Sequence, residues 1–196
     1  MRTLAWTAIG AQAAFTIGWV VAGTQQPGYS ATRQVVSRLA AGGAAHPWIV
    51  TLALLAWAGG FAALAAALPG PLVARGLFAA CALLAAALAV LPLDCPSCAR
   101  SWHHVAHLYA SGVLELVLLA TPFALRRHIA GAAGLAICAL VTLGAAGADH
   151  GLWQRVGLLS ASAWVVLVAA PLTSARGATP SRRSPRPARP HPAARR

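Results

Sequence analysis

The side chains best suited to chemistry lie between Leu93 and Leu108, where the sequence reads LDCPSCARSWHHVAHL. This stretch contains an acid, two cysteines and three histidines, whereas the sequence on either side is almost unbroken Ala, Leu, Val and Gly. Ionisable side chains are costly inside a lipid bilayer, so a cluster of them in a very apolar chain indicates a functional site. The pattern locates this site without naming a substrate.

The histidines of this stretch have a spacing that suits a metal ion. His103 and His107 are four residues apart, so on a helix they share one face and two imidazoles could bind zinc. His150 or Asp94 would supply a further ligand. No Glu follows His103, so the zinc-protease HExxH pattern is absent. Ordinary hydrogen-bonded histidines at a membrane interface remain the alternative interpretation.

A hydrolase acting on a lipid or an amide would need an activated water and groups that hold the substrate. A bound metal would activate the water, and the candidate catalytic residues are Ser37, Asp94 and His104. Guanidinium groups suit an anionic lipid head group or a carboxylate, so the candidate substrate-binding residues are Arg33, Arg38 and Arg155. We expect Ser37, Asp94, His104 and His107 to converge in one outer cavity.

Two of the four cysteines, Cys95 and Cys98, form a Cys-Pro-Ser-Cys motif. On an oxidising face of the membrane this spacing predicts a local disulfide or a free pair. A redox-active motif is the alternative, but such enzymes need a second cysteine pair to pass electrons on. Cys81 and Cys138 fall in different apolar stretches and do not form one.

Composition places these residues in a membrane protein. The chain has 196 residues, of which 59% are hydrophobic and 9% charged, with mean hydropathy +0.68. Soluble domains carry about 25% charged residues. The formal charge of +12 comes from arginine alone, much of it after the last apolar stretch. This distribution favours a tail that contacts membrane lipids and sets topology over nucleic-acid binding.

Six stretches have the roughly 20 apolar residues that a membrane-spanning helix needs. They are Leu4–Ala22, Pro47–Leu68, Leu72–Leu93, Val105–Leu125, Ile129–Gly147 and Leu152–Leu172. The predicted fold is an all-α, polytopic six-helix transmembrane bundle over residues 1–173. The Arg- and Pro-rich segment 174–196 is predicted to be a disordered cytoplasmic tail.

Arginine placement orients this bundle in the cell membrane. With both termini cytoplasmic, the inner side carries eleven arginines and the outer side four, as the positive-inside rule expects. The polar site then faces outward, beside the long first outer loop. In that loop Ser30 can cap a short amphipathic helix through about Ala41, suited to lying on the membrane surface.

Several short motifs together resemble a known family. Pro27-Gly28-Tyr29-Ser30 precedes Arg33, Ser37 and Leu39, an acid follows the third apolar stretch, and a histidine opens the fourth. With Gly151-Leu-Trp-Gln-Arg155 at the entry to the last stretch, this pattern resembles the bacterial membrane proteins grouped as domain of unknown function 998. The resemblance implies a six-helix integral membrane protein and no established reaction.

A looser likeness concerns the set Ser37, Asp94 and His103/His107, which looks like that of the alkaline ceramidase and progestin-receptor-like membrane hydrolases. Three classes of function follow. The first is a protein that binds a lipid head group or a partner at its outer face, and the second is a metal-dependent membrane hydrolase. The third is a small transporter that uses Glu115 as its intramembrane site. The sequence does not decide whether the protein is an enzyme.

Overall fold

The computed structural model describes residues 1–95, 97–125 and 149–174, and every regular element in these ranges is helical. Five of the helices are long and apolar enough to cross a membrane. They are α1 (Arg2–Gln25), α2 (Pro47–Ala67), α3 (Leu72–Val90), α4 (Trp102–Ala124) and α6 (His150–Ser174). A short 3-10 helix, η1 (Val36–Ala40), lies between α1 and α2. The predicted helix Ile129–Gly147 and the tail after Ser174 lie outside the described residues.

The helix ends follow local sequence signals. α2 begins with Pro47 in its first turn, where a missing N–H costs nothing. α3 was predicted to reach Leu93 but ends at Val90, because Pro92 disfavours a helical backbone at the preceding residue, Leu91. α4 begins three residues earlier than predicted, since Ser101 caps it and accepts a hydrogen bond from the His104 amide. All three clustered histidines therefore lie in the first two turns of α4.

Small residues and rings join α1 to α2. A β-carbon at Gly60 would lie 2.5 Å from that of Ala11, so this position allows the two backbones to approach closely. The rings of Phe15 and Trp57 stack with their centroids 4.3 Å apart. The indole N–H of Trp57 donates to Gln12 Oε1 at 2.6 Å, which satisfies a polar pair inside the bundle.

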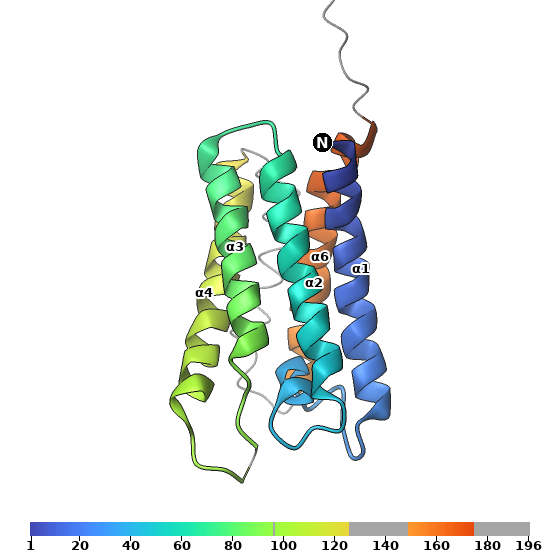
Figure 1. Ribbon diagram of the computed structural model, residues 1–196, viewed down its shortest axis with the longest axis vertical. Coiled ribbons are helices and arrows are strands. Elements are labelled where there is room, and N and C mark those ends of the chain that lie inside the picture. Colours follow the sequence, from blue (N-terminus) through green and yellow to red (C-terminus); the bar gives the residue numbers. More distant parts are fainter. Residues whose placement is uncertain (96, 126–148, 175–196) are drawn as a thin grey trace, which may run out of the picture.

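The long helices run alongside one another, and their connections gather at two ends (Figure 1). The N-terminus, the α2–α3 connection and the end of α6 lie at one end. Residues 26–46, residues 91–95 and 97–101, and the start of α6 lie at the other, which we call the polar end. The start of α1 and the end of α6 thus lie at the same end of the bundle, as an arrangement with both termini on one side of a membrane requires.

The predicted helix from Ser30 to about Ala41 is wrong. Turns occupy the first part of this segment, and only Val36–Ala40 is helical, in the 3-10 form. The backbone groups of a regular helix are used elsewhere: the Thr32 carbonyl accepts from the Leu152 amide, and the Val36 amide donates to Gln154 Oε1. The expected apolar face survives, because Val36 and Leu39 are buried.

Candidate functional site

The start of α6 holds the first loop against the bundle. A β-carbon on Gly151 would lie 2.4 Å from the Gln34 carbonyl oxygen and 2.6 Å from that of Ala31, so only glycine permits this approach. The next amide, that of Leu152, donates to the Thr32 carbonyl at 2.9 Å. This contact fixes the position of the loop residues that follow, including η1.

Arg155, one turn further along α6, completes the attachment. Its guanidinium donates to the carbonyls of Ala31, Gln34 and Gly151 and to the Tyr29 hydroxyl. The side chain is 8% exposed, and its guanidinium also lies over the Tyr29 ring. Burial raises the pKa of Tyr29, although the bond from Arg155 acts in the opposite direction. Arg155 therefore positions the loop, and its proposed contact with a substrate stays a prediction.

The loop brings Ser37 to His107. The Ser37 hydroxyl lies 3.1 Å from His107 Nε2, and His107 Nδ1 lies 2.5 Å from the Leu91 carbonyl oxygen. A carbonyl can only accept, so Nδ1 carries the hydrogen and Nε2 of the neutral ring accepts from Ser37. His107 is buried at 3% exposure. Of the two histidines expected to converge with Ser37, His107 is the one that contacts its hydroxyl in the structure.

Asp94 and His104 form a separate cluster around Ser101. The carboxylate of Asp94 accepts from the Ser101 amide at 2.6 Å and from the Ser101 hydroxyl at 2.9 Å. The backbone N–H of Asp94 donates to His104 Nδ1 at 3.2 Å. The pKa of Asp94 is lowered chiefly by the hydrogen bond from the Ser101 amide. Desolvation acts in the opposite direction, and the Ser101 hydroxyl, His104 and His103 each lower the pKa by a smaller amount.

Hydrogen bonds to backbone carbonyls link the loop that carries Ser37 to the segment that carries Asp94. Arg38 donates to the Asp94 carbonyl at 2.9 Å, and the Gly42 amide donates to the Leu93 carbonyl at 3.1 Å. The loop that carries Ser37 is thus bound to the α3–α4 connection as well as to α6. Arg33 is exposed on the same loop.

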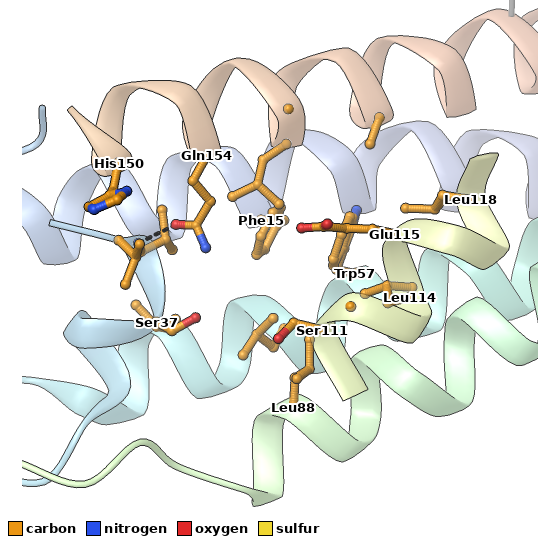
Figure 2. A pocket seen from close by; sticks show the side chains of 18 of the residues that line it. Phe15, Ser37, Trp57, Leu88, Ser111, Leu114, Glu115, Leu118, His150 and Gln154 are labelled. Atoms are coloured by element: carbon orange, nitrogen blue, oxygen red, sulfur yellow. Dashed lines mark hydrogen bonds between the residues drawn. The ribbon is translucent and has the colours of Figure 1, made fainter. Parts of the chain in front are cut away.

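A cavity of about 750 Å³ extends from the polar end into the bundle (Figure 2). Apart from Glu115, its deeper walls are apolar and come from α1, α2, α3, α4 and α6, with Phe15, Trp57, Leu88 and Leu118 among them. Its outer wall carries polar side chains, namely Arg33, Ser37, Arg38, His150 and Gln154. Outside the lining, a hydrogen bond of 2.8 Å from Trp164 Nε1 to Thr121 Oγ1 joins α6 to α4. The cavity therefore has a polar and an apolar end.

Glu115 lies on the α4 wall of this cavity, deeper than Ser37 (Figure 2). Its carboxyl group lies among the apolar lining residues of the membrane-spanning part of α4. Sequence analysis identified this acid as a candidate intramembrane site, and in the structure it lines the cavity.

A comparison with family models adds one finding to this geometry. The model described as Protein of unknown function (DUF998) matches residues 8–171. The chain belongs to the DUF998 family. The match confirms the resemblance drawn from the loop and α6 motifs, and the apolar helices suit an integral, multi-pass membrane protein. No curated protein and no solved structure matches the chain significantly.

The predicted zinc ligands of this DUF998 protein lie in different surroundings. His107 uses both ring nitrogens in the contacts with Leu91 and Ser37, while His103 Nδ1 lies 2.5 Å from the Ser101 hydroxyl. His150 lines the cavity on α6. Among the described residues, no three His, Cys, Asp or Glu side chains form a group that could hold a metal. Zinc binding stays a prediction.

The predicted local disulfide is present between Cys95 and Cys98 in this DUF998 protein. Cys81 is a buried free thiol, and Cys138 lies outside the described residues.

Sequence reasoning missed three contributors to the site: Ser101, Gln154 and the Leu91 carbonyl. A serine three residues before His104 is a helix-cap signal that could have identified Ser101. Pro92 predicts that the preceding carbonyl leaves the helix. Gln154 had a weaker signal, a polar side chain next to Arg155 near the start of a mostly apolar helix.

Proposed function

We propose that the protein binds an amphiphilic, lipid-like molecule in the cavity between α4 and α6. The apolar chain of the ligand occupies the deep part beside Trp57 and Leu118, and its polar head lies at the polar end. The observation that supports this assignment most is the division of one cavity into a polar mouth and an interior that is apolar apart from Glu115. Its volume of about 750 Å³ falls within the range of small-molecule sites, roughly 300–1,000 Å³.

Charge at the mouth favours an anionic head group. Arg33 and Arg38 both line the cavity there, and their guanidinium groups can bind a phosphate or carboxylate through two parallel hydrogen bonds. The acid among the lining residues, Glu115, is on the deeper α4 wall, away from that mouth. A ligand with its anionic group at the polar end and its chain inside avoids placing two negative charges together.

Topology supports access to such ligands. We place the protein in the cell membrane with six spans and both termini in the cytoplasm, so that the polar end is extracytoplasmic. α4 and α6 carry most of the cavity lining and are both long and apolar enough to span the bilayer. A lipid in the outer leaflet would then have its head group at the depth of Arg33 and Ser37.

Photochemical crosslinking tests the binding. A fatty acid with a diazirine in its chain and an alkyne for capture is irradiated with the purified protein, and crosslinked peptides are identified by mass spectrometry. We expect adducts at lining residues such as Leu88 and Leu118. Leu158→Trp should reduce them, because Leu158 lines the cavity, whereas Leu159→Trp should not, because Leu159 is 46% exposed and outside the lining.

Two outcomes would contradict the proposal. One is crosslinking confined to outward-facing residues such as Leu83, which is 74% exposed. The other is equal labelling of the lining residues in the two tryptophan variants.

A further inference from the structure

We propose that Ser37 and His107 form a nucleophile–base pair that cleaves an ester or amide of the bound amphiphile. The substrate class rests on the proposed function, whereas the reactivity of Ser37 does not. The pair needs no metal ion, unlike the hydrolase considered from the sequence.

The orientation of His107 carries the inference. Pro92 forces Leu91 out of the α3 helix, which leaves the Leu91 carbonyl to accept a hydrogen bond from His107 Nδ1 at 2.5 Å. That bond fixes the tautomer with an unprotonated Nε2, and this nitrogen lies 3.1 Å from Ser37 Oγ. A serine within hydrogen-bond distance of a base that a third group orients is the arrangement that activates a nucleophile.

The environment of Ser37 suits an attack on a bound ligand. Ser37 lines the cavity, and its hydroxyl lies at the polar end (Figure 2). Val36 and Leu39 on either side of it are buried at 4% and 1% exposure, which anchors η1. The carbonyl carbon of an acyl lipid whose chain occupies the cavity would lie near this end.

The Ser37–His107 bond is not required to attach the loop. Arg155 and Gly151 hold its first half, and Arg38 and Gly42 hold its second half. A purely structural serine at this place would add one hydrogen bond to a loop that is already fixed. Ser37 lies between a cavity and the oriented base His107, which is the arrangement that nucleophilic catalysis requires.

The proposed cleavage uses Ser37, His107 and hydrogen-bond donors of the cavity lining. Ser37 Oγ attacks the substrate carbonyl carbon while its proton moves to His107 Nε2, and the carbonyl oxygen becomes negative. The amide N–H groups of Gln154 and the guanidinium of Arg33 are donors in the cavity lining that can stabilise this oxygen. The bond to the leaving alcohol or amine then breaks, and the leaving group takes the proton from His107.

Hydrolysis of the acyl-serine restores the protein. Water attacks the ester carbon and gives one proton to His107 Nε2. The bond between that carbon and Ser37 Oγ then breaks, and Oγ takes the proton back. The products are a carboxylic acid and an alcohol or amine, with no change in oxidation state.

Labelling with an alkyl fluorophosphonate tests the nucleophile directly. This probe phosphonylates activated serines, and mass spectrometry identifies the modified residue. We expect modification of Ser37 in the full-length wild-type protein, none in Ser37→Ala, and a rate at least tenfold lower in His107→Asn, since general-base catalysis contributes about 10²–10⁴-fold. Ser30→Ala is the matched control and should label normally. Ser30 lies on the same loop as Ser37 but outside the cavity lining, and its hydroxyl lies 3.2 Å from the Thr32 hydroxyl.

Each result decides one of the two proposals. A wild-type protein that is not modified at Ser37, while the diazirine fatty acid still crosslinks to the lining, would overturn the nucleophile and leave lipid binding intact. Modification of Ser37 without such crosslinks would overturn lipid binding and leave the nucleophile intact. Equal labelling of wild type and a folded His107→Asn would overturn the role of the histidine. If His107→Asn does not fold, the comparison of wild type, Ser37→Ala and Ser30→Ala still decides whether Ser37 is activated.

Discussion

Gly151 lies so close to Gln34 that a β-carbon at position 151 would be 2.4 Å from the Gln34 carbonyl oxygen. Gly151→Ala should therefore force α6 and the first loop apart. We expect it to lower the free energy of unfolding by about 1–3 kcal/mol, the usual cost of overpacking. It should also slow labelling of Ser37, because the loop would no longer hold the hydroxyl against His107. Thermal unfolding in detergent and fluorophosphonate labelling measure the two effects.

Gly76→Ala is the matched control. A β-carbon at Gly76 on α3 would have nothing within 4 Å, and alanine favours helix over glycine by about 1 kcal/mol. We expect unchanged or slightly higher stability and unchanged labelling. A Gly151→Ala protein as stable as Gly76→Ala would show that the close contact is not needed.

Arg155→Lys should loosen the same loop by a different route. A lysine ammonium is a point charge on a flexible stem, so it cannot reproduce the planar set of bonds to the Ala31 and Gln34 carbonyls and the Tyr29 hydroxyl. Hydrogen bonds to charged groups contribute about 1.5–3 kcal/mol each, so we expect a clear loss of loop stability. Limited trypsin digestion should cleave after Arg33 and Arg38 faster than in wild type.

Arg33→Lys is the control for this digestion. Arg33 is exposed, and lysine keeps its charge and its trypsin site. Cleavage after position 38 should then proceed at the wild-type rate. If Arg155→Lys and Arg33→Lys were equally resistant to trypsin, Arg155 would not be what holds the loop.

The lowered pKa of Asp94 predicts how the free energy of unfolding depends on pH. Its folded-state pKa is lowered, first by the Ser101 amide, so its contribution is present above the unfolded value of 3.8 and lost as pH falls through the folded pKa. Asp94→Asn should therefore be less stable than wild type at neutral pH. The difference in stability between the two proteins should narrow as the pH falls below 3.8. Thermal unfolding of both proteins at pH 7 and pH 3 measures it.

Ser101→Ala separates the two bonds to this carboxylate. The variant keeps the backbone amide, the largest cause of the lowered pKa, and removes the hydroxyl. It should retain more of the pH dependence than Asp94→Asn does. A stability difference between wild type and Asp94→Asn that stays constant from pH 7 to pH 3 would contradict this account.

The sequence predicted the helices well and the site geometry in part. Apolar runs of about 20 residues leave few alternatives to spanning helices, and all five that fall in the described residues are present. The first loop was mispredicted because local spacing cannot show that the start of α6 takes the hydrogen bonds of Thr32 and Val36. The choice between His104 and His107 depends on contacts with Leu91 and Ser37, which are distant in sequence and which local spacing cannot show.

The disulfide between Cys95 and Cys98 yields the last prediction. These residues are only three apart in sequence, so the cross-link restricts little of the unfolded chain, and Cys95→Ser/Cys98→Ser should cost no more than about 2 kcal/mol. The hydrogen bonds between Asp94 and Ser101 do not involve either sulfur and should keep the α3–α4 connection in place. Labelling of Ser37 should therefore match the wild type, with or without reductant. Iodoacetamide should modify Cys95 and Cys98 of the wild type only after reduction. Alkylation without reductant would show that the pair is free, and loss of Ser37 labelling in the folded double variant would show that the disulfide supports the site.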